Sequence, residues 1–150
     1  MLSHAPYNER AQAFRRLARE MGFAGSLSGE VRHDVSDYVR RYANAPEERR
    51  PTGLIASNDG IAIRLLVGLG AAGISVPRQV SVVGIDGRPW GADAAPPLTS
   101  WEYDWSEWGR RAVRFLIGLA RGESPPTPDP VGGQLLPRGS TGPPPRTAGV

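Results

Sequence analysis

The sequence predicts an α/β fold in which a parallel sheet is flanked by helices. Amphipathic segments and short apolar segments alternate in the order αβαβαβ, and parallel strands need such helical crossovers between them. Residues 80–85 are rich in β-branched side chains and apolar on both faces, as expected of a buried parallel strand. A chain of 150 residues is long enough for about one domain with a single core.

The composition excludes several classes of protein. No apolar run reaches the ~18 residues that cross a bilayer, and the start lacks the features of a secretory signal, so we expect a soluble cytoplasmic protein. The absence of cysteine excludes disulfides and thiolate metal sites. All 18 basic residues are arginine, which excludes lysine-dependent phosphate and Schiff-base chemistry. The net charge is only +3 and the arginines are spread along the chain, which argues against a nucleic-acid surface.

The first two expected helices are amphipathic. In residues 10–22 apolar side chains recur at helical spacing, arginines face away, and Gly22 suits the position after the helix end. Residues 23–28 are a weak strand candidate, and residues 29–34 form a loop with capping signals. A second helix is marked by apolar residues from Val35 to Ala43 and ends near Pro46.

The segment 51–60 predicts a short strand, Leu54 to Ala56, that runs into a helix cap. Asn58 or Asp59 can offer a side-chain oxygen to the first N–H groups of the next helix. In an open α/β sheet, ligands bind at the carboxyl ends of strands. Asn58 is therefore a candidate ligand contact, and the alternative is that it serves only as a helix cap.

The third expected helix, residues 60–72, is apolar nearly all round and must be covered on both sides. It either lies in the core or contacts a second subunit, and the candidate dimer-interface residues are Ile61, Arg64, Leu65 and Gly68. The glycines at positions 68, 70 and 73 match GxGxxG. They lie at the end of a helix instead of between a strand and a helix, so we expect no nucleotide there.

Asp86 ends the strand 80–85 at the same topological position as Asn58, so the two side chains can converge on one ligand. The alternative is that Asp86 is a turn residue in an Asp-Gly pair. A loop that carries Trp90 follows, and a fourth helix is expected from about Trp105 to Arg121. Prolines and glycines dominate from Glu123 onward, and residues 139–150 are expected to be a disordered tail.

Several motifs together resemble the lactose/galactose-repressor (LacI/GalR) family of transcription regulators. They run in register from about position 10 to position 144: the helix R-x-x-A-F at 10–14, P-T at 51, A-S-N-D at 56–59, G-I-S-V-P at 73–77, V-S-V-V-G-I-D at 80–86, P-P-L-T at 96–99, G-R-R-A at 109–112 and R-G-S-T at 138–141. Sugar-binding periplasmic proteins share the fold and the aspartate at the strand end. The P-P-L-T segment and the lack of a signal peptide favour a regulator.

The resemblance implies a periplasmic-binding-protein-like effector domain. In this family two α/β subdomains clamp an effector, often a sugar or purine, and closure changes how the dimer presents its DNA-binding headpieces. Arg10, Asn58 and Asp86 match the effector-contacting residues of the family. Tyr103 stands where many members have a glutamine that lines the pocket, and Val31 stands where an aromatic ring often stacks on the sugar. These two differences leave the ligand class open.

The resemblance also implies a division of the chain. Residues 1–138 would form a partial effector-binding domain, with the C-terminal subdomain at 1–100, a crossover into the N-terminal subdomain at 101–134 and a return at 135–138. The family's helix-turn-helix, hinge helix and first half of the effector domain do not precede Arg10, so we expect DNA contact only through a headpiece absent from this chain. The helix from Trp105 would then lack the sheet on which it packs in the family.

Two functions stay open. The first is the effector-sensing part of a LacI-type regulator, with weak or no binding of a sugar-like or nucleoside-like molecule by this chain alone. The alternative is a dimerisation or protein-interaction module that uses helix 60–72 and binds no small molecule. An enzyme is not expected, because His4 and His33 have no nucleophile or carboxylate at a recognisable spacing, and we expect no metal and no cofactor.

Overall fold

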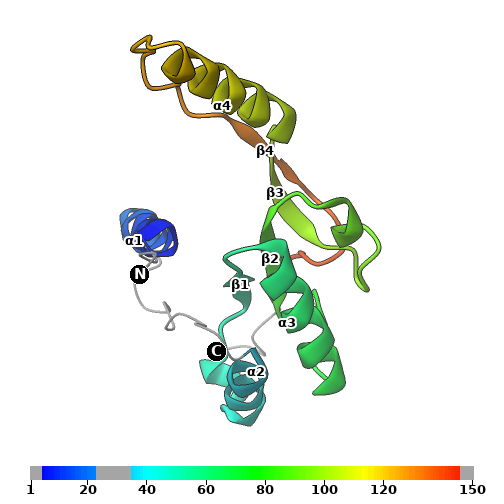
Figure 1. Ribbon diagram of the computed structural model, residues 1–150. Coiled ribbons are helices and arrows are strands. Elements are labelled where there is room, and N and C mark those ends of the chain that lie inside the picture. The colour runs from blue at the N-terminus through cyan, green and yellow to red at the C-terminus, as the bar shows by residue number, and fades with distance from the viewer. Residues whose placement is uncertain (1–4, 23–34, 146–150) are drawn as a thin grey trace.

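The computed structural model describes residues 5–22 and 35–145 (Figure 1). The expected strand at 23–28, the loop at 29–34 with Val31 and His33, His4, and the last residues of the expected tail lie outside this part of the chain. The described elements are α1 (Ala5–Glu20), α2 (Val35–Asn44), the 3-10 turn η1 (Glu47–Arg49), β1 (Gly53–Ile55), α3 (Asp59–Ala71), β2 (Ser81–Asp86), the 3-10 turn η2 (Pro89–Gly91), β3 (Thr99–Tyr103), α4 (Trp105–Ala120) and β4 (Gly133–Leu136).

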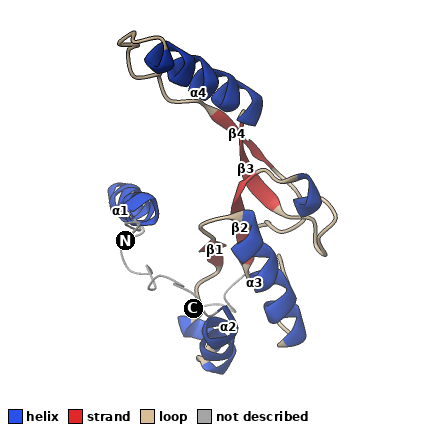
Figure 2. Cartoon of the chain, viewed as in Figure 1, coloured by secondary structure: helices blue, strands red, loops and turns tan. Residues whose placement is uncertain are grey.

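The strands form one sheet in the order β1-β2-β3-β4 (Figure 2). β1 and β3 both pair with β2 in parallel, with Leu54 opposite Val82 and Ile85 opposite Trp101. β4 pairs with β3 in the antiparallel direction, with Leu135 opposite Trp101. The predicted α/β fold with a parallel sheet is confirmed for β1 to β3. The antiparallel edge strand β4 was not predicted, because its apolar sequence is short and has polar flanks.

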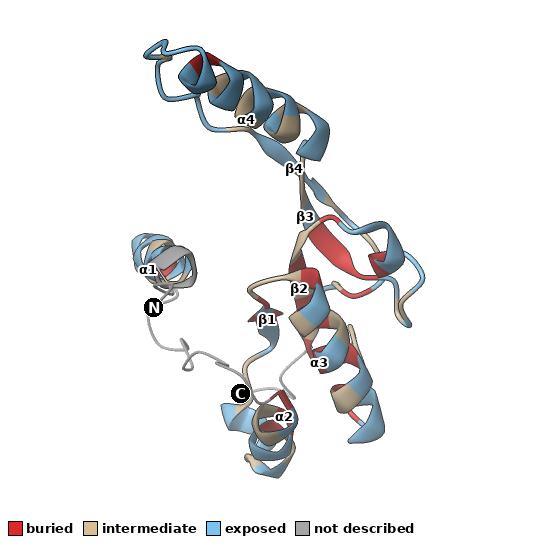
Figure 3. Ribbon diagram, in the orientation of Figure 1, coloured by how far each residue is buried: buried red, intermediate tan, exposed pale blue. Residues whose placement is uncertain are grey.

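The core lies between the sheet and the helices α2 and α3, where Figure 3 shows most of the buried residues. Val82 of β2, Leu98 and Leu69 of α3 are completely buried in this cluster. Gly84 lets α3 approach β2 closely, because a Cβ atom there would lie 2.2 Å from Oδ1 of Asp59. The core therefore fixes the start of α3 directly over the end of β2.

The helix α3 is apolar nearly all round, as predicted, and its own domain covers most of it. Leu65 is only 2% exposed and belongs to the core. Gly68 faces α2, since a Cβ atom at this position would lie 2.9 Å from Val39. Leu65 and Gly68 therefore pack within the monomer. Of the four predicted dimer-interface residues, the half-buried Ile61 and the exposed Arg64 remain accessible to a second subunit.

The helices α1 and α4 lie away from this core (Figure 1). α1 begins at Ala5, earlier than predicted, and its apolar side chains Phe14, Leu17 and Met21 are 44%, 50% and 70% exposed. α4 connects β3 to β4, and it lies at the end of the ribbon that these two strands form, beyond the rest of the sheet. None of the helices in residues 5–22 and 35–145 is long and apolar enough to cross a membrane.

Residues 139–142 pack against the sheet, although the sequence suggested that a disordered tail begins at 139. Ser140 is completely buried, and its hydroxyl donates to the Val82 carbonyl (2.6 Å) and accepts from the Thr99 N–H (2.8 Å). Gly142 donates from its backbone N–H to the hydroxyl of Ser81 at 3.1 Å. The structure therefore moves the start of any tail beyond residue 142.

Candidate functional site

The strands β1 and β2 present Asn58 and Asp86 at the same edge of the sheet, because the strands are parallel neighbours. Asn58 follows β1 and caps α3, since its Oδ1 accepts a hydrogen bond from the Ile61 N–H at 2.8 Å. The prediction that Asn58 is a helix cap is thus confirmed for its side-chain oxygen. That bond does not use the amide NH2 group, which can donate to a ligand.

Asp86 stands at the end of β2 in an unusual backbone conformation. Its φ angle is 130°, the one positive value among the non-glycine residues of the described ranges. The next residue, Gly87, has φ 67°, and a Cβ atom there would lie 2.5 Å from the backbone Cα of Glu102. Positive φ angles at both residues and the close approach of Gly87 to Glu102 therefore end the strand, and the backbone of Asp86 is strained in a way that is found at functional sites.

The carboxylate of Asp86 reaches the first turn of α3. Its pKa is raised, chiefly because the group is partly desolvated and then because the Asp59 carboxylate is near. Arg88, Arg10 and a hydrogen bond from the backbone N–H of Asp59 act in the opposite direction. The Asp86 carboxylate therefore lies beside the residue that follows Asn58, and on the same side of the sheet as that helix start.

Arg10 connects α1 to this edge of the sheet. Its Nη1 donates to the backbone carbonyl of Ser57, at the end of β1, at 2.9 Å. The same guanidinium lowers the pKa of the Asp86 carboxyl through its positive charge. The structure thus brings together Arg10, Asn58 and Asp86, three of the five ligand-binding residues that the sequence suggested.

Asp59 has a structural role that the sequence did not reveal. It is completely buried, its Oδ1 accepts from the Ser100 hydroxyl (2.5 Å), and its Oδ2 accepts from the Arg88 N–H (2.7 Å). The Ser100 hydroxyl also accepts from the Gly87 N–H at 3.1 Å. This cluster joins the start of α3 to the end of β2 and the start of β3, and it holds the backbone that follows Asp86 in place. The signal in the sequence is an acidic residue beside the cap Asn58, and it does not indicate which residues Asp59 contacts.

Aromatic side chains flank Asp86 on the side of α4. The indole Nε1 of Trp105 donates to the backbone carbonyl of Asp86 at 2.8 Å. The guanidinium carbon of Arg88 lies 5.0 Å from the centre of this indole, and the Tyr103 ring meets it edge-on at 5.6 Å. Tyr103 therefore contacts Trp105, which in turn contacts Asp86. Trp105 was not among the predicted site residues. Val31 lies outside the described residues.

A cavity of about 690 Å³ lies next to this aromatic group, between the start of α4 and the start of β4. Tyr103, Trp105 and Gln134 line it, and Asn58, Asp86 and Arg10 do not. The polar side chains at the strand ends and this open cavity are therefore separate features of the described part of the chain. In the described ranges no His, Asp and Glu side chains are grouped so that they could hold a metal ion.

Comparison with known families and proteins supports the fold. The model of the periplasmic binding protein-like domain matches residues 3–141. The chain is 30% identical over 116 residues to a probable opine utilization operon repressor of Rhizobium rhizogenes, covering 76% of this chain and 58% of that protein. It is 32% identical over 83 residues to the arabinose metabolism transcriptional repressor of Geobacillus stearothermophilus, covering 55% of this chain and 23% of that protein.

Solved structures of transcription regulators share the fold. A LacI family transcriptional regulator from Bifidobacterium animalis aligns with a TM-score of 0.77 at 25% identity, over 91% of this chain and 51% of its own. A LacI family regulator from Arthrobacter aligns with a TM-score of 0.58 at 30% identity, over 72% of this chain and 40% of its own. The chain thus spans about half or less of these solved structures, and it belongs to the periplasmic binding protein-like domain family, in the form carried by LacI-family transcriptional regulators.

Proposed function

We propose that this chain is the effector-sensing part of a LacI-type transcriptional regulator and binds a sugar-like or nucleoside-like molecule at Arg10, Asn58 and Asp86. The observation that carries the proposal is the position of the Asp86 carboxylate at the start of α3, beside Asn58 and under the influence of Arg10. In this proposal the chain carries the effector site, and DNA contact is made outside it.

The chemistry of the three side chains suits a ligand with several hydroxyl groups. The Asp86 carboxylate can accept from two hydroxyls, the Asn58 amide can donate, and Arg10 donates as a planar fork. Arg88, Arg10 and a hydrogen bond from the Asp59 N–H favour the charged, accepting form of Asp86, and they oppose the desolvation that raises its pKa. The Arthrobacter regulator was solved in complex with lactose, which supports a carbohydrate as the first class of ligand to test.

We expect weak binding by this chain alone. The polar groups at the strand ends do not line the cavity of about 690 Å³, whereas small-molecule sites that bind tightly bury most of the ligand. A dissociation constant in the millimolar range corresponds to only about 4 kcal/mol, which two or three hydrogen bonds to a solvated surface can supply. Tyr103 and Val31 remain expected contacts of a ligand that extends beyond the three polar residues.

Ligand-observed NMR with lactose, glucose, adenosine and guanosine at millimolar concentrations tests the proposal. We expect saturation transfer to at least one of them in the wild type and none in Asp86→Asn. Asp93→Asn is the matched control, because Asp93 is exposed beyond η2. Equal signals from wild type and Asp86→Asn would place the ligand elsewhere. A micromolar ligand would contradict the view that the site is only half built.

The second candidate function is a dimerisation module that uses α3 and binds no small molecule. It is favoured by the exposed side of this helix, where Val67 is 68% exposed and Arg64 is exposed. The lac repressor was solved as a dimer bound to its operator, and we propose a homodimer here as well. Sedimentation at several concentrations separates the candidates, since a strict monomer that binds a sugar leaves only the first.

A further inference from the structure

The peptide group between Asp86 and Gly87 is held at both of its edges by side chains. The indole Nε1 of Trp105 donates to the Asp86 carbonyl at 2.8 Å, and the Gly87 N–H donates to the Ser100 hydroxyl at 3.1 Å. A peptide group is planar and rigid, so two contacts on its opposite edges fix its orientation. That orientation sets the ψ angle of Asp86 and the φ angle of Gly87.

The backbone of Asp86 needs such support. Its φ angle of 130° lies in a region that L side chains rarely adopt, and such a conformation persists where the surrounding structure over-determines it. The N–H of Arg88 is held in addition by Oδ2 of Asp59 at 2.7 Å. The three supporting side chains thus come from three elements, with Asp59 on α3, Ser100 on β3 and Trp105 on α4.

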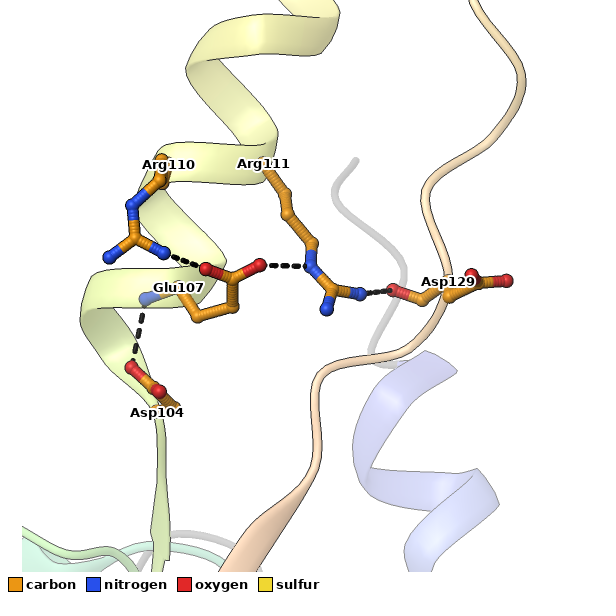
Figure 4. Close-up of polar contacts among 5 residues, drawn as sticks. All are labelled: Asp104, Glu107, Arg110, Arg111 and Asp129. Carbon is orange, nitrogen blue, oxygen red and sulfur yellow. Dashed lines mark hydrogen bonds and ion pairs between the residues drawn. The ribbon is translucent and has the colours of Figure 1, made fainter.

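The start of α4 holds Trp105 in place. Asp104 caps the helix, because its Oδ1 accepts from the Glu107 N–H at 2.8 Å. Figure 4 shows that Glu107 also pairs with Arg111, which donates to the Asp129 carbonyl at 3.0 Å. The first turns of α4 are therefore bound to the preceding residue and to the segment that returns along the helix, and Trp105 projects from this anchored turn.

The ring of Trp105 makes a second contact next to Asp86. The guanidinium carbon of Arg88 lies 5.0 Å from the ring centre, and the charge of Arg88 lowers the pKa of the Asp86 carboxyl. The backbone N–H of Asp59 donates to the same carboxylate. Trp105 thus binds the carbonyl of Asp86 through its N–H, and through its ring it contacts a cation that acts on the carboxylate.

We propose that Trp105 is a positioning residue for Asp86: together with Ser100 it fixes the peptide plane that follows Asp86, and it thereby directs the Asp86 carboxylate toward the start of α3. The inference rests on the proposed function for the ligand-binding role of Asp86. It adds a residue of α4 that acts through the aspartate by binding its backbone.

Trp105→Phe tests the proposal, because phenylalanine keeps an aromatic ring and removes the N–H. Trp105 is 41% exposed, so the exchange leaves the core intact. Trp108→Phe is the matched control on the same helix. The Trp108 ring meets Trp105 at 6.4 Å, and its N–H has no hydrogen-bond partner in the described part of the chain.

The ionisation of Asp86 is measured by carbon NMR of its carboxyl group, which is assigned by its absence from Asp86→Asn. We expect the raised pKa of Asp86 to fall toward 3.8 by about half a pH unit or more in Trp105→Phe, since a released carboxylate is better solvated. Trp108→Phe should leave the pKa unchanged. A loss of global stability alone does not move this pKa in the folded protein, so the measurement separates positioning from a structural role.

Two further measurements complete the test. The Trp105 indole N–H should exchange with solvent at least about tenfold more slowly than that of Trp108. In saturation-transfer titrations with lactose, the dissociation constant should rise about fivefold in Trp105→Phe, as expected for one lost hydrogen bond, and stay within about twofold in Trp108→Phe.

Failure of the positioning role and failure of the proposed function give different results. If the wild type does not bind lactose, the carbohydrate ligand of the proposed function is contradicted, and the ionisation of Asp86, which needs no ligand, decides the role of Trp105. An Asp86 pKa that is equal in wild type and Trp105→Phe, equal exchange of the two indole groups, or an unchanged lactose dissociation constant in Trp105→Phe overturns the positioning role.

Discussion

Ser100 is expected to hold together the polar cluster behind the candidate site, and Ser100→Ala tests this directly. Its buried hydroxyl donates to Oδ1 of Asp59 (2.5 Å) and accepts from the N–H of Gly87 (3.1 Å), a residue that is also buried. Alanine keeps the backbone and almost the whole volume of serine. The substitution therefore removes two hydrogen bonds and leaves the packing unchanged.

The loss can be assigned a magnitude from these two contacts. A hydrogen bond to a charged group contributes about 1.5–3 kcal/mol, and one between neutral groups about 1 kcal/mol. We therefore expect the free energy of unfolding to fall by about 3 kcal/mol. This is a large share of the roughly 5–15 kcal/mol that stabilises a small domain.

Urea denaturation followed by tryptophan fluorescence measures the change. With a slope of about 2 kcal/mol per molar urea, the midpoint should fall by about 1.5 M. Ser106→Ala, at an exposed position of α4, is the control and should change the free energy by less than about 0.5 kcal/mol. A loss below about 1 kcal/mol in Ser100→Ala would mean that water replaces the hydroxyl, and it would refute the view that Asp59 is sealed from solvent.

Three further outcomes are expected. The raised pKa of Asp86 means that this carboxyl contributes stability below its ordinary value of 3.8 and loses that contribution as pH rises through the folded-state pKa. The free energy of unfolding of Asp86→Asn should therefore rise relative to that of the wild type as the pH rises from 4 to 7. A difference in urea midpoint between the two proteins that stays constant or falls over this range would contradict this. Gly87→Ala should lower the free energy of unfolding by at least about 2 kcal/mol, since its Cβ would meet the Glu102 backbone. Gly122→Ala, with open space around it, should lower it by about 1 kcal/mol, and an equal fall in melting temperature for the two variants would contradict the clash. Arg50→Met should cost about 1–2 kcal/mol in denaturation, because Arg50 donates to two carbonyls at the end of α2, at 2.7 and 2.9 Å; an unchanged midpoint would show that water substitutes for it.

Local sequence patterns predicted the elements that position the site. The β-branched run before Asp86 predicted β2, and the cap before an apolar helix predicted the end of β1 and the start of α3. Because parallel neighbouring strands end at one edge, these two patterns were sufficient to place Asn58 and Asp86 near each other. The ligand-binding role of these residues remains a prediction.

Partners that are distant in the sequence could not be predicted in the same way. Asp59 looks like a helix-cap residue, and only the fold shows that it is buried against Ser100 and Arg88. Ser140 lies in a segment rich in glycine and proline, and its burial depends on two strand positions 41 and 58 residues earlier. Composition describes what a segment can do alone, whereas a buried hydrogen bond depends on which groups the packing brings within about 3 Å.

By itself the sequence determined the α/β class, the direction of the central strands and the residues at their ends, since periodicity and capping act within a few residues. The tertiary structure decided which apolar faces are covered. α2 and the sheet cover Leu65 and Gly68 of α3, whereas Trp108 and Leu116 of α4 stay 57% and 61% exposed. An amphipathic helix has the same sequence pattern whether its apolar face is buried or exposed. The pattern shows that an apolar face exists, and only the fold shows whether another element packs on it.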